Sequence, residues 1–200
     1  MRWDRFFDDL EDQLASEWEA ERAALDSEAE RLRLSRVPLA DRLRALAARD
    51  GGEPVTFELI DGTALRAVVT GVGADWLALA PAEGRPGAVI VPFASLAGVG
   101  MPHAELLRTA RPSSAPTALA ERMTLGFVLR DLVRRRAGVT LHLTSGRVLT
   151  GTIDRAGADH LDVALHETGT PRRAEAVGGY RIVPFAALAW IRADEAPALP

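Results

Sequence analysis

The chain of 200 residues contains no cysteine, no lysine and no asparagine. The lack of cysteine excludes disulfides, thiolate metal ligands and a cysteine nucleophile, and it suits a reducing compartment. No stretch is long and apolar enough to span a membrane, and the opening letters MRWDRFFDDL lack the apolar core of a signal peptide. These absences predict a cytoplasmic protein that does not bind a membrane.

The composition is that of a folded protein. Hydrophobic residues make up 48% of the chain and charged residues 26%, with a formal net charge of −4. These values lie in the globular range and far from the disordered one. All the positive charge is arginine, and alanine, glycine and proline are plentiful, a bias typical of a GC-rich genome. The length fits one mid-sized domain or two small ones.

An internal repeat favours two domains. The letters VPFASLAGV at Val91–Val99 recur as VPFAALAWI at Val183–Ile191, an offset of 92 residues. A longer stretch beginning at Val55 recurs without a gap from Val139, an offset of 84. Copy two therefore carries eight extra residues between these stretches, in the letters HETGTPRRAEAVGGY. Such self-similarity is the signature of a structural unit written twice.

Each copy shows the pattern of one helix followed by five strands. In VTFEL and VTLHL apolar and polar residues alternate, and Asp61-Gly62 and Ser145-Gly146 then supply tight hairpin turns. GVGAD leads into a further strand, so it is interpreted as a hairpin and not as a phosphate-binding loop, which needs a helix there. The fourth strand ends at the proline of VPF, since proline cannot donate to a ladder. LADRLRALAAR and LGFVLRDLVRR precede the two copies as helices.

The sequence thus predicts an α+β fold with a long N-terminal helix followed by two tandem helix-plus-five-strand small β-barrels. The expected domains are an acidic, amphipathic helical arm at 1–36, copy one at 37–101, a linker at 102–117, copy two at 118–192 and a disordered tail at 193–200.

The spacing of Leu143, Gly146, Leu149, Gly151 and Ile153 resembles the first motif of the Sm-like family of small, SH3-like barrels. That motif is an apolar strand, a glycine turn and a second strand with a glycine at its bend. The letters VPFAALAWI fall in the register of the second motif of Hfq-like members. The resemblance implies two Sm-like barrel repeats in tandem.

The sequence departs from that family where its members bind RNA. Copy one has Ala67 at the bend, and Pro92-Phe93-Ala94 and Pro184-Phe185-Ala186 stand where bacterial members carry Tyr-Lys-His. The resemblance therefore implies that the usual RNA pocket is missing. Family members pair the fourth strand of one barrel with the fifth strand of the next, using backbone groups. We therefore expect the covalent tandem to satisfy one such junction internally, as a built-in dimer.

The segment 2–36 contains no glycine or proline, and its apolar residues recur at three- or four-residue steps, which predicts the N-terminal helix. Two interpretations of its apolar stripe stay open. It docks on a barrel, or it pairs with its copy in another chain as a short coiled coil. The candidate protein-interaction residues are Trp3, Phe6, Phe7, Leu10, Leu14 and Trp18.

Arginines are concentrated in copy two, at the end of its helix, in its first hairpin and in its extra segment. If they lie along one side, they would neutralise phosphates in salt-dependent, sequence-independent binding. The competing interpretation is that the helix dipole and GC-rich coding favour arginine at these places. The candidate nucleic-acid-binding residues are Arg130, Arg134, Arg135, Arg136, Arg147, Arg172 and Arg173.

No catalytic residue, metal site or cofactor is predicted. His142, His160, Asp162 and His166 are close in sequence, but no ligand spacing enforces their convergence, so solvated polar faces are favoured over a metal site. The serines lack a nucleophile-elbow context, and a barrel this small is filled by its own side chains. The chain is therefore not expected to be an enzyme.

The sequence favours a non-catalytic binding or scaffolding protein that acts through protein–protein contacts. The contacts are expected with a protein partner or by self-association, through the N-terminal helix or the barrel edge strands. The alternative is a nucleic-acid-binding or regulatory protein that uses the arginine surface of copy two. An accessory subunit of an enzyme is a third interpretation.

Overall fold

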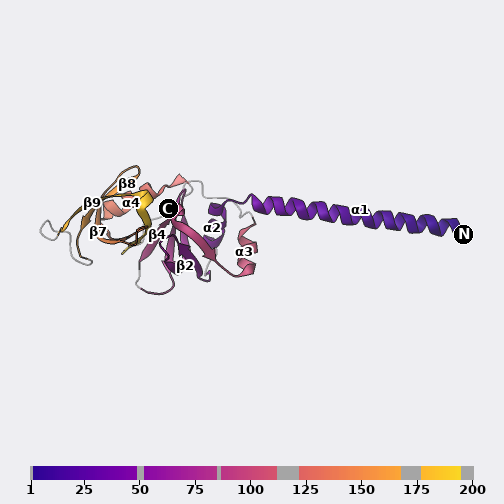
Figure 1. The fold of residues 1–200 in the computed structure, drawn as a ribbon, viewed down its shortest axis with the longest axis horizontal. Helices are drawn as coiled ribbons and strands as arrows, with labels where there is room; N and C mark the ends of the chain where they lie inside the picture. The colour runs from indigo at the N-terminus through magenta and orange to yellow at the C-terminus, as the bar shows by residue number, and fades with distance from the viewer. Residues whose placement is uncertain (1, 49–51, 85–86, 112–121, 168–176, 195–200) are drawn as a thin grey trace. The chain divides into compact units, whose positions relative to one another are not determined.

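The computed structural model describes residues 2–48, 52–84, 87–111, 122–167 and 177–194. Between residues 2 and 20 it describes the side chains of Ser16, Trp18 and Glu19 alone. The chain divides into two compact units, Met1–Pro38 and Leu39–Pro200. The first unit contains helix α1, and the second contains all the described strands (Figure 1).

Helix α1 spans Arg2–Ser35. Its sequence contains neither glycine nor proline, the two residues with the lowest helix propensity. Arg33 Nε lies 2.8 Å from Glu30 Oε2, one turn earlier, a spacing at which opposite charges favour the helix. The helix ends shortly before Pro38, which has no N–H to donate and restricts the residue before it. No helix in the described part of the chain is long and apolar enough to cross a membrane.

The second unit is built on one antiparallel sheet of ten strands, in the order β5-β1-β2-β3-β4-β10-β6-β7-β8-β9. Strands β1–β5 come from copy one and strands β6–β10 from copy two, and both sets lie in the same order. The strands are β1 Val55–Leu59, β2 Ala64–Val72, β3 Trp76–Pro81, β4 Ala88–Pro92, β5 Leu96–Gly100, β6 Gly138–Leu143, β7 Val148–Ala156, β8 His160–Leu165, β9 Gly179–Pro184 and β10 Leu188–Ala193.

The predicted fold class is wrong, because the strands form one open sheet and not two five-strand barrels. The first strand of each copy pairs with its fifth strand, as β1 with β5 and β6 with β10. The fourth strand of copy one does not close back on its own copy. It pairs instead with β10 of copy two, which joins the two sets of five into one sheet.

The pairing of β4 with β10 confirms the expected internal junction between the fourth strand of one copy and the fifth strand of the other. Ile90 lies opposite Ile191, Val89 opposite Arg192 and Ala88 opposite Ala193. We call this strand pair the junction. Strands β5 and β9 lie at the two ends of the sheet, and we call them the open edges.

Local sequence explains the strand boundaries. Gly62 and Gly146 adopt positive φ values of 85° and 79° in the two hairpin turns, where other residues would be strained. Strands β4 and β9 both end at proline, and short 3₁₀ turns, η1 Phe93–Ser95 and η4 Phe185–Ala187, lead into β5 and β10. GVGAD is the β2–β3 hairpin, as predicted.

Within the described residues, the same unit contains the helices α2 Leu39–Ala47, α3 His103–Thr109 and α4 Leu125–Arg135. Helices α2 and α4 precede the first strands of their copies and bury apolar residues such as Leu43 and Leu129. Helix α3 lies inside the segment that the sequence analysis assigned to a linker. Neither copy has a separate core: Trp76 and Ile90 of copy one pack in the core of copy two, and Trp190 of copy two packs in that of copy one.

Candidate protein-interaction surface

Beside the junction, copy one contacts copy two through the β2–β3 turn. Trp76 is buried, and its Nε1 donates a hydrogen bond of 2.8 Å to the carbonyl oxygen of Met123, just before α4. The same carbonyl accepts the backbone N–H of Ala74 at 2.9 Å. Gly73 permits this close approach, because a Cβ there would lie 2.1 Å from Trp76 Nε1. The start of α4 is thus held by copy one.

Asp75 of the same turn completes the contact. Its Oδ1 accepts the backbone N–H of Leu125, the first residue of α4, at 2.7 Å. Thr124, the residue at the N-cap position of α4, makes no side-chain cap. A carboxylate at a helix N-terminus satisfies a donor that has no partner within the helix and interacts favourably with the helix dipole. Asp75 therefore acts as a cap supplied from the other copy.

We expect Asp75→Ala to lower the free energy of unfolding by about 1 kcal/mol, the usual cost of losing a helix cap. Urea denaturation followed by circular dichroism measures it. The matched control is Asp159→Ala at the equivalent place in copy two, whose side chain bonds only its neighbour His160 among the contacts that the structure describes. Equal losses in the two variants would contradict the assigned cap.

Copy two reaches back into copy one through Trp190. Its Nε1 donates to Asp61 Oδ2 at 3.0 Å, in the β1–β2 turn of copy one. The ring of His142 stacks on Trp190 with centroids 3.5 Å apart, and the guanidinium of Arg192 lies 5.6 Å from the Trp190 ring. Nearby, buried Ser95 donates from Oγ to the carbonyl oxygen of Leu188 at 2.6 Å. Polar contacts therefore cross the junction in both directions.

Burial lowers the pKa of His142 from its ordinary value of 6.5, and Arg192 acts in the same direction, whereas Asp61 opposes them. Since the pKa is lower in the folded chain, the unfolded chain binds more protons once the pH falls through about 6.5. We therefore expect the free energy of unfolding to decrease below that pH and this contribution to be constant above it. Urea denaturation at about pH 7.5 and about pH 5 measures the change.

The control for this pH dependence is His142→Phe, which keeps a ring against Trp190 and removes the titrating group. The loss of stability on acidification should be smaller in this variant than in the natural chain. An unchanged pH dependence would show that His142 does not contribute.

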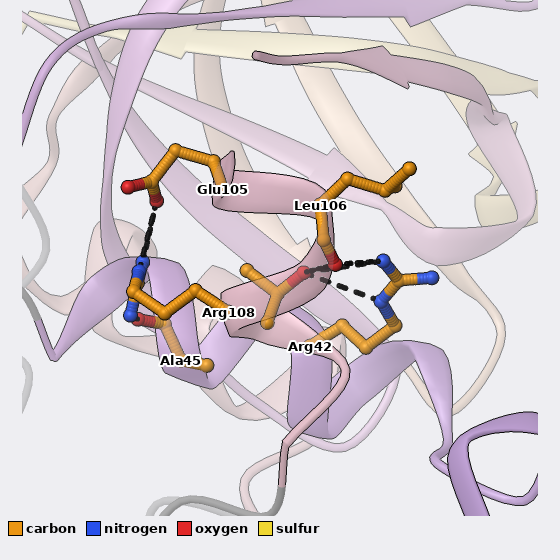
Figure 2. A network of polar contacts seen from close by, with 6 residues as sticks. Arg42, Ala45, Glu105, Leu106 and Arg108 are labelled. Carbon is orange, nitrogen blue, oxygen red and sulfur yellow. Dashed lines mark hydrogen bonds and ion pairs between the residues drawn. The ribbon is translucent and has the colours of Figure 1, made fainter. Parts of the chain in front are cut away.

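A second polar cluster joins α2 to α3 (Figure 2). Arg42 of α2 donates from Nη2 to the carbonyl oxygen of Leu106 at 2.8 Å and to Thr109 Oγ1 at 3.2 Å. In return, Arg108 of α3 donates from Nη1 to the carbonyl oxygen of Ala45 at 3.0 Å, and its other nitrogens contact Glu105. Each arginine donates to a backbone carbonyl near the end of the other helix, so the cluster holds α2 and α3 together.

The open edges differ from the junction in exposure. On β9, Tyr180 and Ile182 are exposed, and Ile182 is 73% exposed. On β5, every residue is exposed or half-buried. Every strand that lies between β5 and β9 in the described sheet has neighbours on both sides. In the described sheet, each open edge therefore has a strand neighbour on one side alone, and it carries apolar side chains that are exposed or half-buried.

The predicted arginine surface is only partly described. Arg134 and Arg135 both pair with the buried carboxylate of Asp131 on their own helix, the second with an Nε–Oδ2 distance of 3.0 Å. Arg136 is exposed and has a φ of 53°, at the left-handed position that ends α4. Arg130 and Arg147 are exposed, and Arg172 and Arg173 lie outside the described residues. No contact described by the structure joins the candidate arginines to one another.

The candidate residues of α1 are mostly outside the described side chains. Those of Trp3, Phe6, Phe7, Leu10 and Leu14 are not described, whereas Trp18 is exposed. Leu25 and Leu32 are exposed as well. The two interpretations of the apolar stripe on α1 both stay predictions.

The polar residues weighed as a metal site have separate partners. His142 stacks on Trp190, His160 Nδ1 lies 2.8 Å from Asp159, and His166 Nε2 lies 2.7 Å from Thr152 Oγ1. Within the described residues, no group of three or more His, Cys, Asp or Glu side chains is placed to hold a metal ion. These histidines therefore belong to separate contacts on the sheet.

Comparison with known proteins gives no match: no protein-family model, no curated protein and no solved structure matches the chain. The resemblance to Sm-like repeats therefore stays a prediction.

Sequence reasoning missed the residues that cross the junction. The sequence pattern places Trp76 and Trp190 in predicted strands, and each stands where the other copy has a different residue, His160 and Gly98 respectively. An aromatic residue present in only one of two equivalent strands was the available signal. It marks a place where the two copies have different neighbours.

Proposed function

We propose that this protein is a non-catalytic scaffold that binds protein partners through the open edge β9. The observation that carries the proposal is that β9 has a strand neighbour on one side alone in the described sheet and exposes Tyr180 and Ile182. A partner strand that pairs with such an edge gains affinity from main-chain hydrogen bonds and specificity from side chains. Natural edge strands are usually protected against such pairing, so an exposed apolar edge indicates a use.

The side chains of β9 also suit a protein interface. Tyr and Arg are enriched at interfaces because they offer a large contact area together with hydrogen-bonding groups. Tyr180 and Arg181 stand next to each other on this strand, and both are exposed. By contrast, the arginine alternative has less support among the described residues, since Arg134 and Arg135 are already paired with Asp131.

Photo-crosslinking in cells of the source organism tests the proposal. A photoreactive phenylalanine analogue is placed at Ile182 on β9, and in a control chain at Val148, which is also exposed but lies on β7 inside the sheet. We expect discrete crosslinked products from position 182 and none of the same mass from position 148. Mass spectrometry identifies the partner. Equal or absent crosslinking at both positions would overturn the proposal.

A further inference from the structure

We infer that the partner of β9 is strand β5 of a second copy of this chain, in the register of the junction. This inference rests on the proposed function and names its partner. The junction is a contact between two different surfaces, the fourth strand of one copy and the fifth strand of the other. Such a heterologous contact leaves the complementary surface free at each end, and here those surfaces are β9 and β5. The chain thus has an open fourth strand, β9, and an open fifth strand, β5, and it already pairs one fourth strand with one fifth strand at the junction.

The first support comes from matched residues of the fourth strands. At the offset of 92, Ile182 on β9 is the equivalent of Ile90 on β4. Ile90 is fully buried opposite Ile191 in the junction, whereas Ile182 is 73% exposed. The same side chain therefore is core in one copy and uncovered in the other. A second copy of β5 would cover Ile182 with Val99, the equivalent of Ile191.

The second support comes from the helix contact beside the junction. Beside the junction, Asp75 accepts the first N–H of α4, and Leu125 at that position is buried. Asp159, the equivalent of Asp75, has a side chain that is 89% exposed, and Leu39, the equivalent of Leu125, is 49% exposed. In a contact between copies, Asp159 of one chain would face the start of α2 of the next. Asp159 and Leu39, the equivalents of the two residues that meet beside the junction, are thus both exposed.

The third support is complementarity of size and charge at the open edges. The junction register carries Arg181 opposite Gly100, in the place where Val89 lies opposite Arg192. Each pair contains one arginine and one smaller residue. The arginine stands on the fourth strand in Arg181–Gly100 and on the fifth strand in Val89–Arg192. Gly100 lines a hollow of about 310 Å³ whose charged residues are Glu53, Glu105 and Arg66. Arg181 would extend over Gly100 towards exposed Glu53, with no side chain at Gly100 in the way.

Disulfide trapping tests the inference, because the natural chain contains no cysteine. Two full-length single variants, Val99→Cys and Ile182→Cys, are mixed under mild oxidation, one of them carrying a mass tag. The predicted register places these residues opposite each other, where strand partners lie about 4.5–5.5 Å apart, within the range that a disulfide spans. We expect a tagged–untagged dimer of twice 21.5 kDa, in at least about tenfold excess over the yield from Val99→Cys mixed with Val148→Cys.

A neighbouring register pair and a blocking change make the test independent of any one variant. Gly100→Cys with Arg181→Cys should also crosslink, since a Cβ at Gly100 meets only ordinary contacts, the nearest at 3.6 Å. Adding Leu39→Glu to the β5 chain places a negative charge against Asp159 and should lower the yield. Pairing through α1 would bring chains together without placing 99 against 182, so it does not produce the selective product.

Each outcome decides the question. Selective crosslinking of both register pairs supports the inference. Yields equal to the Val148→Cys control overturn it, whether or not the chains associate. If photo-crosslinking at Ile182 then identifies a different protein, the scaffold proposal stands and only its partner changes. If position 182 crosslinks nothing, the proposed function fails as well.

Discussion

Ile90→Asp is expected to unfold the sheet unit, whereas Ile182→Asp at the equivalent position should change the free energy of unfolding of the dilute, unassociated chain by no more than about 0.5 kcal/mol. Ile90 is completely buried between β3 and β10, so an aspartate there would place a charge in the core with no designed partner. Ile182 stands on the open edge β9, and its side chain is exposed. The two changes are the same substitution and differ in the burial of the isoleucine that is replaced.

The expected size of the Ile90→Asp effect is at least about 4 kcal/mol, the range for leaving an uncompensated charge in a protein interior. A domain has only about 5–15 kcal/mol of stability in total, so much of the variant would be unfolded. Circular dichroism and urea denaturation of both variants measure the difference. A folded Ile90→Asp chain with a normal urea midpoint would show that the junction is not part of the core.

Trp76→Ala is expected to lower the free energy of unfolding by about 3–5 kcal/mol, the usual cost of removing a buried aromatic ring. Trp76 belongs to copy one but packs in the core of copy two, so its loss should destabilise both copies in one transition. Urea denaturation followed by both far-ultraviolet circular dichroism and tryptophan fluorescence measures it. Two separate transitions, or a loss below about 1 kcal/mol, would contradict this role.

The repeat supplies the control for Trp76. His160 occupies the equivalent position in copy two, is half-buried and bonds its neighbour Asp159, so His160→Ala should cost much less. Trp76→Phe separates the two contributions of the indole. It keeps most of the apolar contact and removes the hydrogen bond to Met123, whose carbonyl oxygen still accepts Ala74 N–H. We therefore expect Trp76→Phe to cost less than Trp76→Ala.

The sequence predicted the local structure of the sheet because local rules determine it. Alternation indicated the strands VTFEL and VTLHL, Gly62 and Gly146 indicated the hairpins, and the prolines of VPF indicated where the fourth strands end. The helices before β1 and β6 followed from the apolar spacing of the repeat. These features depend on residues near each other in the chain.

The repeat and the family resemblance led us to expect a junction between a fourth and a fifth strand, but the sequence did not predict that both sets of five strands lie in one open sheet, because closure depends on pairs far apart in the chain. Nothing in the letters AVIVP states whether β4 closes on its own copy or stays open to pair with β10. Contacts through edge strands were expected, but the residues of β9 were not singled out, for the same reason. Ile182 is unremarkable in the sequence, and its meaning appears only when its equivalent, Ile90, is seen buried. The helix α3 was missed because its apolar run is short and lies in a segment read as a linker.

The place of β10 in the middle of the sheet has a consequence for folding during synthesis. β10 pairs with both β4 and β6, yet it follows all nine other strands in chain order. As the chain leaves the ribosome, β4 therefore lacks its partner β10, and Ile90 stays exposed to solvent, until copy two has been translated. Such long-range pairing folds slowly and leaves unpaired strands open to misassembly. Nascent chains of this protein should therefore depend on chaperones until β10 emerges.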